Sequence, residues 1–372
     1  MSGRLRTFGI IAGAILLVVI GFIFLRGPKP HIEIKAETLW TIGFFEITNT
    51  LFTAWIIIAI LVVVAILSTR NMRYVPSGLQ NGMEAIIEAL YTLCVNTVGE
   101  KNGRRFFPVI ATIFLYIIVS NWMGLTPLFN TIGKVEPIGA EEEHFFEEAF
   151  IFENAGGVSL IVPGSKEIEF HVDEARCAAL EGLEHEECLV HEREVAIAAA
   201  IEEEGVSEDA TVGILAPYFR SVNTDLMSPL SLAIVSAIFV EFWGISTLGL
   251  TAYGSRFFSL RRLRQGNPMG VIDLFVGFLE LIAEIARIIS FTFRLFGNML
   301  AGEVLLLVMT FLIPLLIALP FYGLELFVGA VQAFVFAMLT LVFGALAVTS
   351  HGDHEEKPHA NSGEVAAVHT AE

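Results

Sequence analysis

From residue 271 to residue 313 the chain reads VIDLFVGFLELIAEIARIISFTFRLFGNMLAGEVLLLVMTFLI. As a helix with a rise of 1.5 Å per residue, this stretch would be about 64 Å long, whereas the hydrocarbon core of a bilayer is only ~30 Å thick. The helix must therefore tilt strongly or lie flat. Pro314 permits a turn before the next apolar run, so we expect two long oblique helices that form a hairpin.

The rest of the chain is equally apolar. Of its 372 residues, 55% are hydrophobic, and the mean hydropathy is +0.69. A bilayer-spanning helix needs about 20 apolar residues. Runs near this length occur at 9–25, 47–67, 107–129, 227–250, 271–313 and 320–349. We therefore predict an all-α membrane protein with about five to six membrane helices, including the tilted hairpin.

The net charge of −18 comes from one insert. Residues 136–209 hold 22 acidic and three basic side chains, a balance of −19, while the remainder holds 18 acidic and 19 basic ones. Such a segment cannot lie in lipid, and its acidity argues against nucleic acid binding. Basic residues cluster in loops that all lie on one side of the membrane if each of the first four apolar runs crosses it once. By the positive-inside rule this side is the cytoplasm, so the insert lies on the outer face. These basic residues are Arg4, Arg6, Arg70, Arg73, Lys101, Arg104, Arg105, Arg256, Arg261, Arg262 and Arg264.

These patterns divide the chain into five regions, two of which have alternative interpretations. The run 9–25 is a retained anchor or a cleaved signal peptide. Residues 78–98 have apolar side chains at helical spacing, which favours a helix on the inner membrane surface over a short re-entrant or buried span. The regions are an N-terminal anchor or signal segment (1–30), a membrane region (31–130), an acidic outward-facing insert (131–216), a second membrane region (217–350) and a polar tail (351–372).

The insert contains two of the three cysteines. Its alanine-rich stretch from 172 to 204, with alternating charges, favours helices over strands. In an oxidising exterior, Cys177 and Cys188 can form a disulfide that clips two antiparallel helices, and two free thiols are the alternative. Cys94 lies on the inner side without such a partner. We expect a small folded domain on the outer face.

Charged side chains also lie within the tilted hairpin. Arg294 cannot lose its proton at an accessible pH, and an arginine at mid-membrane costs at least about 2.5–3.5 kcal/mol. Its neighbours at i−4 and i+4 are Ser290 and Asn298, which are not carboxylates, so the guanidinium needs a distant partner or a hydrated cavity. Glu284 and Arg287 have i,i+3 spacing and are expected to neutralise each other.

Carboxylates flank Arg294 along the membrane. On a helix, Glu280 lies about 21 Å before Arg294 and Glu303 about 14 Å after it, on the opposite side. Glu325 is a further carboxylate in the last run. Carboxylates at different depths on each side of a fixed cation suggest two hydrated half-paths separated by a positive barrier. We therefore expect the ion path in the membrane region 217–350 and the acidic insert outside it. No histidine lies in any apolar run, so carboxylates and water would carry protons.

Four motifs stand out along the chain: Arg294-Leu-Phe-Gly-Asn298-Met-Leu-Ala-Gly302-Glu303, Gln332-Ala-Phe-Val-Phe, Asn121-Trp-Met-Gly-Leu-Thr-Pro127 and Asn223-Thr-Asp-Leu. They resemble those of subunit a of the F-type ATP synthase, and the resemblance covers most of residues 38–350. It implies that Arg294 is the arginine of that family, with Asn298, Glu280, Glu303 and Gln332 as its polar partners. Glu325 stands where some relatives have histidine, and the insert is not part of the common pattern.

The resemblance implies a stator subunit that carries ions through two half-channels separated by Arg294. Its implied partners are a ring of small membrane subunits (the c-ring), peripheral-stalk b-type subunits and other synthase subunits, in an energy-transducing membrane such as the bacterial plasma membrane. The sequence has no GxxxxGK[ST] motif, so ATP chemistry is expected on other subunits, and we expect no cofactor or metal. The alternative is a stand-alone secondary ion transporter, which would normally show inverted repeats. The choice between H⁺ and Na⁺ stays open.

Overall fold

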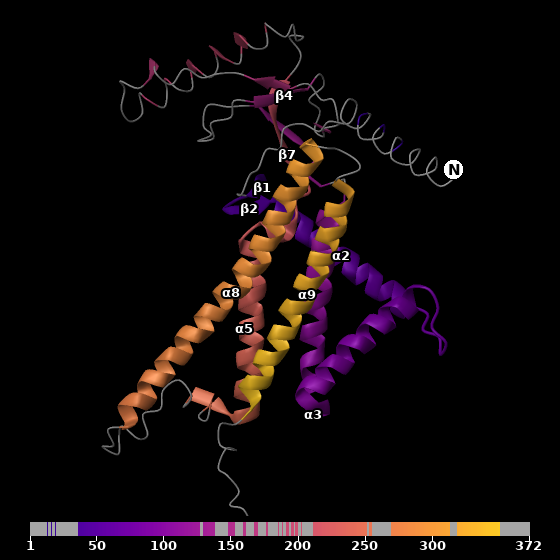
Figure 1. Cartoon of the computed structure of the whole chain (residues 1–372), viewed down its shortest axis with the longest axis vertical. Coiled ribbons are helices and arrows are strands. Elements are labelled where there is room, and N and C mark those ends of the chain that lie inside the picture. The colour runs from indigo at the N-terminus through magenta and orange to yellow at the C-terminus, as the bar shows by residue number, and fades with distance from the viewer. Residues whose placement is uncertain are drawn as a thin grey trace, which may run out of the picture.

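In the computed structural model, five helices among the described residues are long and apolar enough to cross a membrane. They form one bundle with a small sheet at one end (Figure 1). The predicted class of helical membrane protein is confirmed. The run 9–25, apart from three residues, and the tail 351–372 lie outside the described residues. The structure describes residues 13, 16, 19, 36–126, 129–137, 148–152, 159–160, 167–169, 176–177, 185, 188, 191–192, 195–196, 198–199, 202, 211–250, 253–254, 269–312 and 318–349.

The first described span is α2 (Asn49–Thr69), whose 21 residues make about 31 Å of helix, enough for an upright crossing. Thr48 caps it, because its hydroxyl oxygen accepts a hydrogen bond from the Leu51 backbone N–H at 3.3 Å. A hairpin of β1 (Thr38–Ile42) and β2 (Phe45–Thr48) leads into the cap. The apolar pattern did not predict this hairpin.

The next helix, α3 (Leu79–Gly124), joins two segments that were expected to be separate. Its arms, 79–98 and 100–124, meet at a kink where Gly99 has φ +79°. The predicted span 107–129 thus begins earlier and ends at Gly124. The first arm folds back on the second, since the rings of Tyr91 and Phe107 lie 5.4 Å apart, edge to face.

The last three spans include the expected hairpin. Helix α5 (Met227–Leu248) has 22 residues, whereas α8 (Met269–Leu312) has 44 and α9 (Ala318–Val348) has 31. At 1.5 Å per residue, α8 is about 66 Å and α9 about 46 Å long, so neither fits an upright crossing. In Figure 1, α8 and α9 run in opposite directions, and α8 leans away from α5 toward its first residues.

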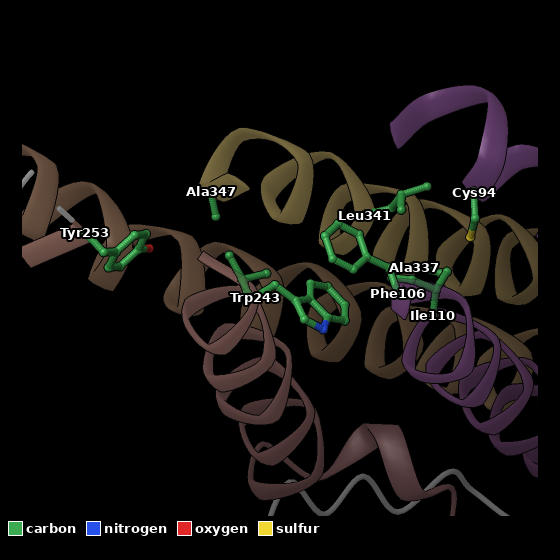
Figure 2. Close-up of a cluster of buried hydrophobic side chains, with 9 residues drawn as sticks. Cys94, Phe106, Ile110, Trp243, Tyr253, Ala337, Leu341 and Ala347 are labelled. Carbon is green, nitrogen blue, oxygen red and sulfur yellow. The ribbon is translucent and has the colours of Figure 1, made fainter. Parts of the chain in front are cut away.

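A buried aromatic cluster joins α3, α5 and α9 (Figure 2). The Trp243 ring stacks on Phe106 with a centroid distance of 4.0 Å, and Leu341 of α9 is fully buried in the same cluster. Cys94, a free thiol, comes from the first arm of α3 and is also buried here. Nearby, Arg105 donates hydrogen bonds to hydroxyls at the end of α5. The cluster therefore fixes the bundle at the end opposite the insert.

The insert contains an antiparallel five-stranded sheet in the order β5-β3-β7-β4-β6. Its first and last strands pair directly, with Gly133 opposite Pro217 and Pro137 opposite Gly213. The sequence predicted helices for 172–204, where the described residues from 185 onward are helical, but it did not predict the sheet. The strands are β3 (Ile132–Pro137), β4 (Glu148–Phe152), β5 (Ser159–Leu160), β6 (Glu167–Glu169) and β7 (Thr211–Pro217).

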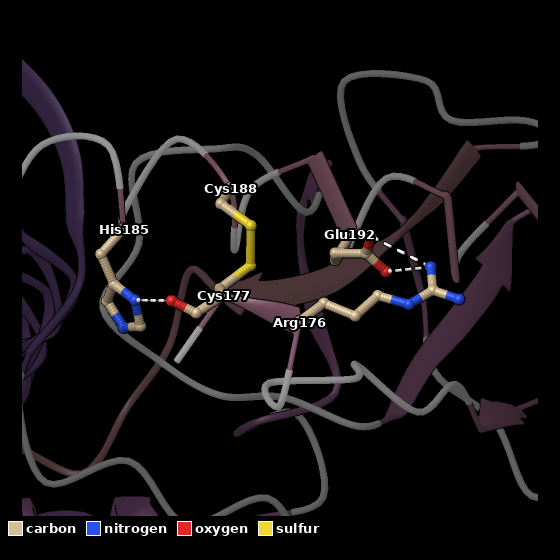
Figure 3. The surroundings of a disulfide bond; sticks show 5 residues. All are labelled: Arg176, Cys177, His185, Cys188 and Glu192. Carbon is tan, nitrogen blue, oxygen red and sulfur yellow. Dashed lines mark hydrogen bonds and ion pairs between the residues drawn. A yellow bond between two sulfur atoms is a disulfide. The ribbon is translucent and has the colours of Figure 1, made fainter. Parts of the chain in front are cut away.

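The two cysteines of the insert form a disulfide with a Cα–Cα distance of 5.8 Å (Figure 3). The imidazole Nδ1 of His185 donates to the carbonyl oxygen of Cys177 at 2.9 Å. Next to the disulfide, Arg176 donates from Nη1 to both carboxylate oxygens of Glu192 at 3.1 Å. Three local interactions thus join residues 176–177 to residues 185–192.

Candidate functional site

One face of α8 packs into the bundle and the other does not. Phe291, Leu295 and Met299, at helical spacing, are buried in an apolar cluster with α3, α5 and α9. The Phe291 ring lies 4.8 Å from that of Phe336 on α9. This packing fixes the rotation of α8, so the polar side chains between these anchors project along its flank.

Arg294 occupies that flank. Its side chain is half-buried, and its guanidinium carbon lies 5.7 Å from the centre of the Phe291 ring. Asn298, one turn further, is exposed, and Gln332 on α9 is half-buried. Within the described part of the chain, none of these three side chains makes a hydrogen bond or an ion pair with another protein group. Arg294 therefore presents a fixed positive charge at the side of the bundle.

The second arginine of α8 is neutralised locally, as its spacing predicted. Arg287 Nη1 lies 2.8 Å from Glu284 Oε2, and both side chains are mostly buried. The Arg287 guanidinium also lies 3.8 Å above the centre of the Phe343 ring, a close cation–π contact. Glu280, the carboxylate of the preceding turn, is half-buried.

A close approach of α8 and α9 accommodates the carboxylate of Glu325. This side chain is buried, with 8% exposure, and lies against Gly302. A Cβ atom at Gly302 would come within 2.1 Å of the carboxyl carbon. Because Gly302 has no side chain, it leaves space for the Glu325 carboxylate. Gly302 directly precedes Glu303 in the sequence.

Glu303 is held from outside its own hairpin. Asn130, in the turn after α3, donates from Nδ2 to Glu303 Oε1 at 2.5 Å. The other carboxylate oxygen, Oε2, is buried and has no hydrogen-bond partner among the described residues. Residues 302 and 303 thus bring the Glu325 carboxylate, the Glu303 carboxylate and the Asn130 amide to the same end of α8.

Two asparagines from the sequence motifs connect three elements beside this group. Asn223 lies in the short 3-10 helix η2 (Val222–Thr224) and donates to Asn121 Oδ1 at 2.7 Å. Asn121, at the end of α3, donates to the Gly329 carbonyl oxygen on α9 at 3.0 Å. Trp122 also donates to α9, from Nε1 to the Leu326 carbonyl oxygen at 3.0 Å. These bonds fix the turn of α9 that follows Glu325.

The segment before α5 adds a polar layer that sequence reasoning missed. Thr50 donates to Asp225 Oδ2 at 2.8 Å, and Asn49 donates to the Pro217 carbonyl oxygen at 3.3 Å. Arg220 is 5% exposed, and its backbone N–H donates to the Thr53 hydroxyl oxygen at 3.3 Å. At α2, the polar residues Asn49 and Thr50 at the start of an otherwise apolar helix could have indicated these contacts. For Asn130, the sequence offered no signal.

Comparison with known proteins agrees with this arrangement. A family model described as "ATP synthase A chain" matches residues 50–345. The chain belongs to the ATP synthase A chain family. It is similar to ATP synthase subunit a of Gloeobacter violaceus, with 24% identity over 324 residues, which are 87% of this chain and 93% of that protein.

As an ATP synthase A chain, the protein is a multi-pass membrane component of the Fo sector and associates with other ATP synthase subunits. The region matched by the family model contains all the predicted ion-path residues and the asparagine network. The acidic segment 131–216 lies within this matched region.

Proposed function

We propose that this chain is the ion-translocating stator subunit of a rotary ATP synthase, with two half-channels that Arg294 separates. Protons would reach and leave the carboxylates of a c-ring through these half-channels. The other partners would be peripheral-stalk b-type subunits, in an energy-transducing membrane such as a bacterial plasma membrane. ATP chemistry would take place on other subunits.

The observation that carries the proposal is the state of Arg294. It lies on a helix long and apolar enough to cross the membrane, half-exposed at the flank, with no ion pair among the described residues. A permanent charge at membrane depth needs a counter-charge or water. A carboxylate supplied by a neighbouring subunit would meet this need, and the open flank of α8 would admit it.

The carboxylates on the two sides of Arg294 support two separate half-channels. Glu303 and Glu325 lie at the end of α8 nearest the insert, and Glu280 lies 14 positions before Arg294 on the other side. A proton taken up on one side cannot pass the guanidinium directly, because the guanidinium does not give up its own proton.

The chemistry follows from electrostatics. A nearby cation favours the ionised form of a carboxylate, so a ring carboxylate that approaches Arg294 releases its proton. The ionised group cannot enter lipid and must gain a proton from the other half-channel before it moves on. Each charge that crosses the membrane releases about 2.3 kcal/mol per 100 mV, and rotation would couple this energy to the catalytic subunits.

The test is the composition of the native complex. Membranes that contain the chain are solubilised in mild detergent, and the mass of the purified complex is measured. We expect a ring of small hydrophobic subunits to co-purify with the chain. A lone monomer or dimer that still moves protons in vesicles would contradict the proposal and support a stand-alone transporter.

A further inference from the structure

The turn that carries Asn130 has an unusual backbone conformation and is held by backbone hydrogen bonds. Asn130 has φ +58°, the one positive φ of a non-glycine residue in the described part of the chain. Asparagine tolerates this conformation better than most residues. Its backbone N–H donates to the Phe219 carbonyl oxygen at 3.0 Å, and the Tyr218 N–H donates to the Ile132 carbonyl oxygen at 2.9 Å. The turn is thus bonded to the chain that returns from the insert.

The two ends of the insert continue this backbone pairing into the sheet. We call residues 130–137 and 211–219 the insert root. Its strands β3 and β7 pair without a break from Gly133 opposite Pro217 to Pro137 opposite Gly213. A Cβ atom at Gly133 would come within 2.1 Å of the Ala216 carbonyl oxygen, which shows how closely the two backbones approach. The root therefore fixes the position of the Asn130 backbone next to α8.

The contact of Asn130 with α8 is of a kind that orients a carboxylate. The amide donates to Glu303 Oε1 at 2.5 Å, and hydrogen bonds to charged groups are shorter and stronger than neutral ones. Since Glu303 Oε2 has no partner among the described residues, this bond sets the orientation of the carboxylate.

We propose that Asn130 is a positioning residue of the ion path, which fixes the Glu303 carboxylate from the insert root. This inference rests on the proposed function, in which Glu303 lines a half-channel. The root of the acidic insert would thus take part in ion transfer, although it lies outside the sequence motifs of the α8–α9 hairpin.

Three variants of the complete complex test the role. Asn130→Gly keeps a residue that accepts positive φ but removes the amide. Asn130→Asp keeps the shape but sets a carboxylate against Glu303. The double variant Asn130→Asp/Glu303→Gln restores one amide–carboxylate pair with donor and acceptor exchanged. Asn71→Gly, at an exposed turn asparagine after α2, is the matched control.

The measurement is ATP-driven proton uptake by inverted vesicles, divided by the amount of assembled complex. We expect Asn130→Gly to lower this flux about tenfold, the effect of losing a hydrogen bond to a charged group. Asn130→Asp should lower it further, the double variant should exceed Asn130→Asp, and Asn71→Gly should match the parent. Parental flux per complex in Asn130→Gly would overturn the inference, as would a double variant below both of its single variants.

Glu303→Gln alone separates this inference from the proposed function. If Glu303→Gln lowers the flux while Asn130→Gly leaves it at the parental level, only the role of Asn130 is wrong. Parental flux in Glu303→Gln would instead contradict the half-channel itself. If Asn130→Asp fails to assemble, Asn130→Gly still decides, because it leaves the charge unchanged and accepts the positive φ of this position.

Discussion

At the residue scale, Arg294 combines a permanent charge with the absence of an ion pair in the described part of the chain. We predict that Arg294→Ala abolishes proton-driven ATP synthesis, because nothing then favours proton release from an approaching ring carboxylate or blocks a direct proton leak. Arg294→Lys should also nearly abolish it, since an ammonium can lose its proton where a guanidinium cannot. Synthesis is measured in vesicles energised by an imposed proton gradient.

The control for these variants is the assembly of the complex. Arg294 is not an anchor of the bundle, so both variants should yield normal amounts of assembled enzyme on a native gel. Near-normal synthesis by Arg294→Ala membranes would refute the role of this residue.

Gly302 gives a second prediction at this scale. In Gly302→Ala, the new Cβ would lie about where the Glu325 carboxylate now lies, at 2.1 Å from its carboxyl carbon. The end of a glutamate side chain can move, so the fold should survive while the carboxylate is displaced. A displacement near 1 Å at a reacting group can cost on the order of 100-fold in rate. We therefore expect proton uptake to fall at least tenfold.

Gly323→Ala is the matched variant, because no atom lies within 4 Å of a Cβ at this exposed position of α9. It should keep parental proton uptake per assembled complex. Equal uptake by the Gly302 and Gly323 variants would show that the position of the Glu325 carboxylate does not matter.

Sequence reasoning at this scale worked for local contacts only. The Glu284–Arg287 ion pair has i,i+3 spacing, and helical periodicity was enough to predict it. The bond between Asn130 and Glu303 joins residues 173 positions apart, and no periodicity connects them. The same holds for the placement of the Glu325 carboxylate, which depends on a glycine of another helix.

At the element scale, apolar runs predicted the helices well because each must fill the membrane. They predicted α3 less well, since its two arms differ in character and the kink depends on one residue. The strands of the insert were missed because they are short. Acidity and alanine content dominate the surrounding stretch, and these favour helices or solvent.

The kink of α3 can be tested at Gly99. Its φ of +79° is unfavourable for residues with a Cβ, by roughly 1–2 kcal/mol per residue. Gly99→Ala should therefore lower the thermal unfolding midpoint of the purified chain in detergent. It should also weaken the return of the first arm onto Phe107.

At Gly82 in the same helix, we expect alanine to have the opposite effect on the unfolding midpoint. A Cβ there meets no atom within 4 Å, and its φ is not positive. Replacing a helical glycine by alanine typically gains about 0.5–1 kcal/mol, so Gly82→Ala should raise the midpoint slightly. An increase in both variants would mean that the kink is not a strained feature of α3.

At the scale of the whole molecule, the insert consists of a root that reaches Glu303 of α8 and an outer part that carries the charge. The root spans 130–137 and 211–219, whereas most of the −19 balance of residues 136–209 lies beyond it. The sequence predicted that the whole insert lies outside the ion path, whereas our proposal for Asn130 keeps this prediction for the outer part and gives the root a role in the path. Its disulfide joins residues of that outer part to each other, not to the membrane helices.

Two deletions distinguish the root from the outer part. The first removes residues 138–212 and joins Pro137 to its ladder partner Gly213 through a short Asn-Gly turn, which suits a tight hairpin between antiparallel strands. The paired residues of β3 and β7 then remain. We expect parental proton uptake per assembled complex, with a lower thermal midpoint. The second deletion removes 131–217 and with it the whole ladder that supports Asn130.

The second deletion should assemble less and, per assembled complex, pump at least several times more slowly, because Glu303 loses a fixed donor. Both deletions remove the same excess of negative charge from the outer part, so charge alone cannot separate their effects. Uptake is measured in inverted vesicles at two salt concentrations, since an electrostatic contribution would be screened at the higher one. If the first deletion pumps as slowly as the second at both concentrations, the outer part is itself required for ion transfer.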